Sequence, residues 1–196
     1  MSDSLTSTVT TGHGMLRDLL DHTTYVAFPR QARDYQGSAD AFLISACRHV
    51  SAVSTVLVAE VARAGDRDRA RLIARECHDL QVAMMRAKAR LYGSGSMSMV
   101  PWDGIWSDVV DRFEALAETE HEVVASLASR LGPDALDELA QRLCLMELRA
   151  PTRPHPNLPR GRLSGRMSQA MCRLTDSIWD GFEGRSPPPC TPFTQG

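Results

Sequence analysis

One helical pattern, over residues 101–131, constrains the fold of this chain more than any other feature. Apolar residues recur there at alternating steps of three and four, the spacing of one face of an α-helix. They are Trp106, Val110, Phe113, Ala117, Val124, Leu127 and Leu131. Glu120 interrupts this stripe where an apolar side chain is expected. A buried carboxylate is costly unless it is paired or binds a metal, so Glu120 is either a ligand inside a helical bundle or a solvated charge at the edge of the stripe.

The rest of the chain repeats the helical period and shows no strand-like alternation. Helices are predicted from residue 11 up to Pro29 and over 39–64, 66–92, 101–131, 134–149 and 162–183. The polar segment 30–40 is expected to be a loop, with Ser38 as the N-cap of the second helix. Gly65 should end that helix, and so short a turn makes the second and third helices antiparallel neighbours. The pattern predicts an all-α fold, an up-down four-helix bundle with additional C-terminal helices.

The domain organisation follows from the same pattern. The Ser/Thr-rich residues 1–10 are expected to be disordered, and residues 11–148 to form the bundle. Residues 149–161, rich in Pro and Arg, should be extended. They are followed by an amphipathic helix over 162–183 and a disordered tail over 184–196.

Composition excludes several classes of function. A formal net charge of -2 argues against a broad nucleic-acid surface, and 6% aromatic residues argue against a base-stacking single-strand binder. The N-terminus lacks the features of a signal peptide, and no apolar run suggests a transmembrane segment, so a cytoplasmic location is expected. The five cysteines include no Cys-x-x-Cys pair and are expected to be free thiols.

Four of the histidines, one on each of four predicted helices, are candidate ligands. They are His13, His49, His78 and His121. A histidine or carboxylate from each of several helices is how bundles build metal sites, and imidazole suits Fe, Zn and Cu. The alternative for His49 and His78 is a packed histidine with a satisfied hydrogen bond. The chain has no nucleophile elbow, P-loop or dinucleotide loop, so an enzymatic role is not favoured.

Acidic residues around Glu120 offer one further motif. Glu118 and His121 form a Glu-x-x-His pair, which places both side chains near one face of the helix. A ferritin-type di-iron site needs two such pairs, and the chain contains only one. Because charged side chains are mostly exposed, Glu118 and Glu122 are interpreted as solvent-facing.

Several of these segments resemble the hemerythrin-like (HHE cation-binding) domain family. FLISACRHVSAVSTVLV is similar to the family's second helix, HDLQVAMMRAKARLYG to its third and HGMLRDLL to the start of its first. FEALAETEHEVVASLASRLGPDALDELAQRL is similar to the fourth helix and the segment after it. The Pro/Arg-rich segment and last helix look like an extension of actinobacterial members. The resemblance covers most of residues 11–183.

The resemblance implies a metal centre, because this family binds two irons with histidines and two bridging carboxylates. His13, His49 and His78 match single ligand histidines, and Glu120 matches the fourth-helix carboxylate. The second-helix glutamate falls at Val53, and the fourth-helix histidine falls at Ala115 or Leu116, with His121 out of phase. The side chains of Val53, Ala115 and Leu116 are apolar and cannot ligate a metal.

We therefore expect a hemerythrin-like protein whose iron site is reduced to one metal or lost. A retained site would serve metal binding or the sensing of O2, peroxide or NO. The alternative is a metal-free bundle that acts as a protein-interaction or regulatory module, with residues 149–183 as the surface for a protein partner. Glu120 is then either the last carboxylate of a reduced site or a relic of a lost one, and the sequence slightly favours the relic.

Overall fold

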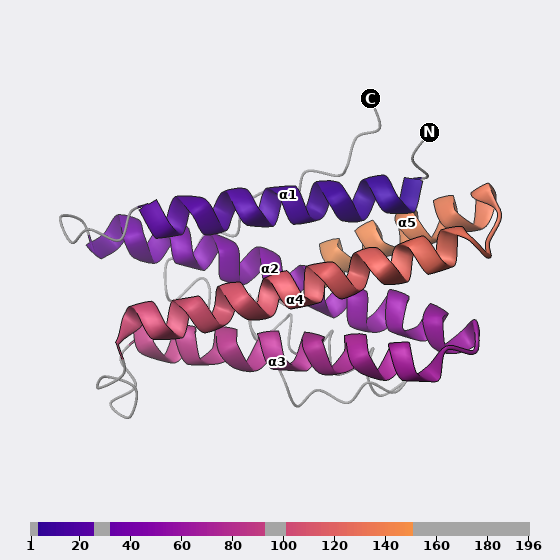
Figure 1. Ribbon diagram of the computed structural model, residues 1–196. Coiled ribbons are helices and arrows are strands. Elements are labelled where there is room, and N and C mark those ends of the chain that lie inside the picture. Colours follow the sequence, from indigo (N-terminus) through magenta and orange to yellow (C-terminus); the bar gives the residue numbers. More distant parts are fainter. Residues whose placement is uncertain (1–3, 26–31, 93–100, 151–196) are drawn as a thin grey trace.

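The computed structural model describes residues 4–25, 32–92 and 101–150, and within these ranges the regular structure consists of five α-helices (Figure 1). Their bounds are α1 Ser4–Tyr25, α2 Ala32–Arg63, α3 Arg67–Leu91, α4 Trp102–Ala128 and α5 Pro133–Arg149. The described part of the chain contains no strand. The prediction of an all-α fold is confirmed.

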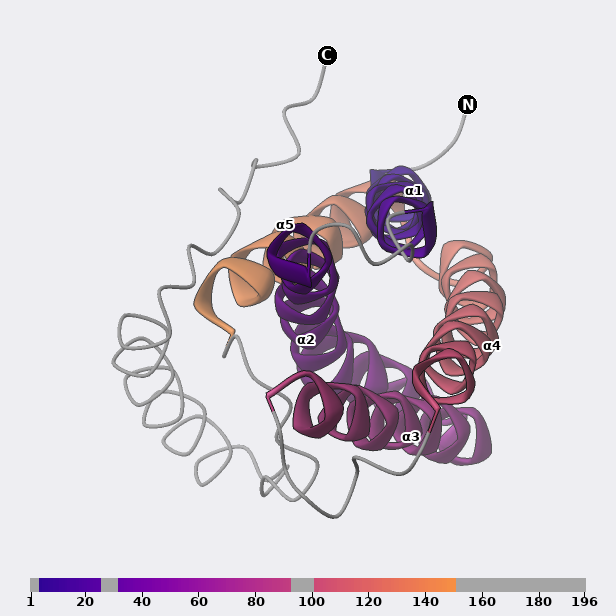
Figure 2. The ribbon, with the colours of Figure 1, turned by 90° about the vertical axis from the view of Figure 1, so that its left-hand side faces the viewer.

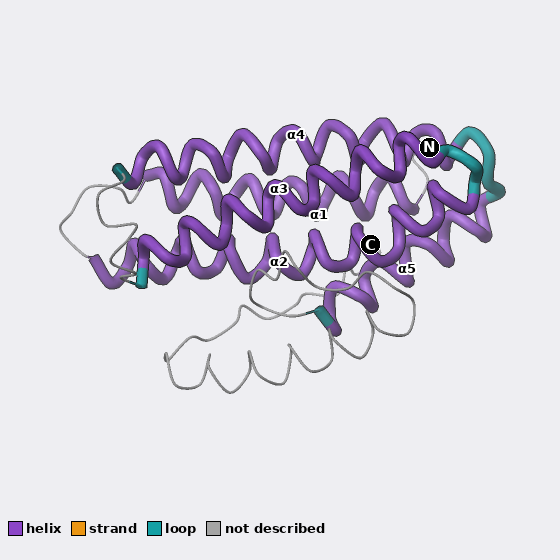
Figure 3. Tube along the Cα trace, turned by 90° about the horizontal axis from the view of Figure 1, so that it is seen from below, coloured by secondary structure: helices purple, strands orange, loops and turns teal. Residues whose placement is uncertain are grey.

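The first four helices alternate in direction and form a ring, which is visible end-on in Figure 2. Each of α1 and α3 packs against both α2 and α4. The fifth helix lies outside this ring and packs against α2 and α1; a view from below shows it beside α2 (Figure 3). The structure is thus an up-down bundle to which α5 adds a cover over the α1–α2 side.

Apolar stripes on the helices meet in one core. On α4 the predicted stripe is buried at most positions, and the buried face extends to neighbouring residues such as Leu116 and Val123. The turn between α2 and α3 follows local rules: Gly65 adopts a φ of 91°, and the Asp66 side chain accepts a hydrogen bond from the Arg69 backbone N–H. Pro133 begins α5, where a missing N–H is tolerated.

Two predicted boundaries are wrong because tertiary packing outweighs weak local signals. Residues 4–10 belong to α1 rather than to a disordered segment, and Leu5 and Val9 are fully buried in the core. The predicted loop over 30–40 belongs to α2 from Ala32 onward. Glycine costs a helix interior only about 1 kcal/mol, so Gly37 does not prevent the helix from extending. The predictions for residues 151–196 lie outside the described residues.

Among the described residues, one segment is apolar enough in length and composition to span a membrane. It is Gly37–Arg63 within α2, and 67% of its most apolar window is buried inside the bundle. Because α2 contacts every other helix of the described structure, core packing accounts for this hydropathy.

Candidate metal centre

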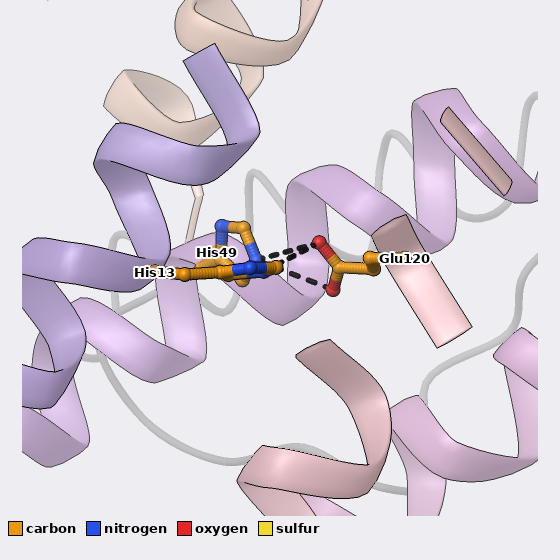
Figure 4. A group of neighbouring side chains, drawn as sticks. All are labelled: His13, His49 and Glu120. Carbon is orange, nitrogen blue, oxygen red and sulfur yellow. Dashed lines mark hydrogen bonds and ion pairs between the residues drawn. The ribbon is translucent and has the colours of Figure 1, made fainter. Parts of the chain in front are cut away.

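Three predicted ligands come together inside the bundle, each from a different helix. His13 lies on α1, His49 on α2 and Glu120 on α4, and Figure 4 shows both imidazole rings directed at the carboxylate. Nε2 of His13 lies 3.0 Å from Oε2 of Glu120. Nε2 of His49 lies 3.0 Å from the same oxygen and 3.2 Å from Oε1. One ligand atom from each of the three residues lies within 4.8 Å of the other two, so the group could hold a metal ion.

All three side chains are withdrawn from solvent. His13 and Glu120 are fully buried, and His49 is 4% exposed. Their positions follow from helical phase, because each continues the buried stripe of its own helix. The stripe of α1 contains Val9, His13, Leu16 and Leu20, and that of α2 contains Phe42, Ala46, His49, Val53 and Val56. The carboxylate of Glu120 is therefore an inner group of the bundle and not a solvated charge at its edge.

A second carboxylate, which the sequence interpretation missed, completes the group. Nδ1 of His49 lies 2.7 Å from Oε1 of Glu147 on α5. With Nδ1–H donating to Glu147, Nε2 of His49 is the atom directed toward Glu120. In metal-binding proteins, a hydrogen bond of this kind fixes the orientation of the ligand ring and raises the basicity of its other nitrogen. The sequence marks Glu147 in the same way as Glu120, because each is a carboxylate at a position where an apolar stripe continues. On α5 this stripe consists of Leu136, Ala140 and Leu143, and Glu147 occupies its next position.

The electrostatics of the group follow from burial and close charge pairing. Burial alone would raise the pKa of Glu120, but the charge of His49 and hydrogen bonds from both histidines lower it to about 2. Burial alone would lower the pKa of His49, but Glu120 and Glu147 raise it well above its ordinary value. For His13, burial outweighs the effect of Glu120, and the pKa is lowered. Without a metal, the group therefore consists of a His49 cation between two carboxylates, beside a neutral His13.

Two further predicted ligands, His78 and His121, stand outside the three-residue group. His78 follows the buried Cys77 on α3 and is half-buried, because one residue rotates a helix position by about 100°. His121 follows Glu120 on α4 and is exposed. Its Nδ1 lies 2.7 Å from the carbonyl oxygen of Ala117, and its ring centroid lies 4.9 Å from that of His13. His121 therefore borders the group without belonging to it.

The donor set suits one ion and not two. Two imidazoles and one carboxylate are the protein ligands of mononuclear non-haem iron sites and of some catalytic zinc sites. Within the described ranges no second cluster of this kind is found. The positions at which the sequence resemblance implies further ligands carry Val53 and Leu116, both apolar and buried, and the exposed Ala115. A di-iron centre of the hemerythrin type therefore does not fit these residues.

No protein-family model, curated protein or solved structure matches this chain.

Proposed function

We propose that this protein is a hemerythrin-like bundle that binds one transition-metal ion, iron in its working state, through His13, His49 and Glu120. The observation that carries the proposal is the convergence of three buried ligand atoms within 4.8 Å, from three helices far apart in sequence. Buried histidines and a buried carboxylate at one point are uncommon unless they are paired or coordinate a metal.

The geometry requires little change to accept an ion. Metal–ligand bonds of about 2.1 Å separate neighbouring ligand atoms by roughly 3 to 4 Å. The present nitrogen–oxygen distances of 3.0 to 3.2 Å are therefore close to those of a loaded site. Bound iron would supply open coordination positions for a small ligand such as O2, peroxide or NO. The protein's own part is to hold the ligands in the core and to limit access by water.

The charge of the group also matches that of a divalent ion. Glu120 and Glu147 carry two negative charges, which in the metal-free protein are only partly balanced by the His49 cation. A divalent ion that displaces the proton from Nε2 of His49 leaves two carboxylates opposite two positive charges. Glu147 keeps its hydrogen bond to Nδ1 throughout, so the ring stays oriented for binding.

Direct metal titration tests the proposal. Protein stripped with a chelator is titrated with Co²⁺, Zn²⁺ and, without oxygen, Fe²⁺, and the bound metal is counted by elemental analysis. We expect one ion per chain. The variants His49→Gln and Glu120→Gln should abolish this binding, whereas Glu118→Gln, an exposed carboxylate on the same helix, should retain it.

The competing explanation is a polar network that holds the bundle together without metal. It predicts no stoichiometric binding of any of the three ions by the folded wild-type protein. That result would overturn the proposal, as would equal binding by Glu120→Gln and Glu118→Gln. Circular dichroism of each variant establishes that it is folded before its binding is interpreted.

A further inference from the structure

The buried group poses a problem of access. Its three ligand residues are between 0% and 4% exposed, so an ion in solvent does not meet them directly. Strongly hydrated divalent ions do not cross an apolar core, because removing their water without replacing it is costly. A polar side chain that contacts both solvent and the group is therefore needed at the point of uptake.

Within the described segments, two side chains meet this requirement, and their contacts distinguish them. The Glu147 side chain is 20% exposed, but it binds Nδ1 of His49, on the other side of the ring from the ligand atom Nε2. His121 is exposed and its ring lies against that of His13, at 4.9 Å between centroids and an angle of 58°. Both side chains reach a ligand ring from the surface, but Glu147 does so at the nitrogen that does not face Glu120, so His121 is the better placed of the two.

The hydrogen bond of His121 prepares it to bind a cation. A carbonyl oxygen only accepts, so Nδ1–H of His121 donates to the Ala117 carbonyl at 2.7 Å. In the neutral ring this leaves the lone pair on Nε2, the state in which imidazole ligates metals. Metal-binding histidines commonly donate their other ring N–H to a backbone carbonyl in this way.

The two ligand histidines differ in how their rings are held. Within the described part of the chain, Nδ1 of His13 is buried and has no hydrogen-bond partner. The ring of His49, by contrast, is fixed by Glu147. Among the described residues, the ring of His13 is held by hydrogen bonding at one nitrogen, to Glu120, whereas the ring of His49 is held at both nitrogens and forms the fixed part of the site.

We propose that His121 is the uptake residue for the buried centre: a divalent cation binds first to Nε2 of this exposed side chain and then passes to His13. This inference rests on the proposed metal site. It assigns His121 a role in the rate of loading and not in final coordination, because its ligand atoms lie outside the three-residue group. Because the ion leaves by the same path, the rates of uptake and release both depend on His121. The dissociation constant, which is the ratio of the two rate constants, does not depend on it.

The test separates rate from affinity. Uptake of Co²⁺ by the metal-free full-length protein is followed by its visible absorption after rapid mixing, and release is followed after addition of excess EDTA. We expect His121→Ala to slow both uptake and release by about tenfold, which corresponds to a higher barrier of ~1.4 kcal/mol, with the dissociation constant unchanged. His22→Ala, which removes an exposed histidine from α1, is the control and should match the wild type.

The outcomes also separate this inference from the metal site itself. If the wild type binds no Co²⁺, the proposed function fails and His121 has nothing to load. If the wild type binds Co²⁺ and His121→Ala loads at the same rate, the uptake role is wrong while the site stands. A weaker equilibrium affinity in His121→Ala would show a fourth ligand, which also contradicts the uptake role. Addition of free imidazole should restore the rate if the missing ring is the cause.

Discussion

Substitution of Glu120 by Gln should strongly destabilise the metal-free protein. The pKa of Glu120 falls from its ordinary value of 4.5 to about 2 in the folded state. That difference corresponds to about 3 kcal/mol of stability, because each pKa unit is worth roughly 1.4 kcal/mol. Gln keeps the size of the side chain but removes the charge that faces His49. We therefore expect Glu120→Gln to lower the free energy of unfolding by about 3 kcal/mol at pH 7.

The pH dependence of this effect follows from its sign. A carboxylate whose folded pKa is depressed adds stability that is present above about pH 4.5 and is lost as the pH falls toward 2. The difference between wild type and Glu120→Gln should therefore shrink below pH 4.5. Urea denaturation followed by circular dichroism, with a chelator present, measures the free energy of unfolding of wild type and of Glu120→Gln at each pH. Glu118→Gln should change stability by less than about 0.5 kcal/mol, as exposed substitutions usually do.

A Glu120→Gln protein as stable as the Glu118→Gln control at pH 7 would refute the reasoning. It would mean that the buried ion pair contributes nothing over a neutral hydrogen bond. A stability loss that persists unchanged at pH 3 would contradict the electrostatic explanation, and would point to altered packing instead.

Further predictions concern the second carboxylate, the His49 proton and two glycines. Glu147→Gln should weaken Co²⁺ binding by about 10- to 100-fold in equilibrium titrations without abolishing it, because it orients a ligand and does not bind the ion. The affinity for Co²⁺ should rise by about tenfold per pH unit up to the raised pKa of His49, since binding displaces that proton; a flat profile between pH 6 and about 7 in the same titrations would contradict the assignment. Gly14→Ala should raise the free energy of unfolding by up to about 1 kcal/mol in urea melts, because the added methyl group meets no atom within 4 Å. Gly65→Ala should lower it by about 1 kcal/mol in the same assay, because φ at this position is 91°.

Helical periodicity predicted the fold because each helix buries a stripe that its own sequence displays. The stripe of α4 identified Glu120 as an anomalous residue, and His13 and His49 occupy equivalent inner positions on α1 and α2. Helical phase placed these three among five candidate ligands, because it determines which side of a helix faces the core, but it did not separate them from His78 and His121.

Other features depend on packing that periodicity does not encode. The sequence gives no sign that α5 packs on α1 and α2, which is the contact that brings Glu147 to His49. His78 and His121 each lie one residue, or about 100° around the helix, from a buried position. The apolar patterns did not show whether these two side chains face the core or the surface. The helical start of the chain was missed because Ser and Thr have weak helix propensity, while the burial of Leu5 and Val9 depends on partners elsewhere.

X-ray absorption spectroscopy of iron-loaded protein is the most direct test of a single ion held by two histidines and one carboxylate. The account predicts scattering from two imidazole rings and from oxygen ligands at about 2.1 Å, with no metal–metal distance. The same iron treatment of His49→Gln should give no bound iron with imidazole scattering, because this variant should not retain the ion. An iron–iron vector, or an oxygen-only shell without imidazole, would contradict the account.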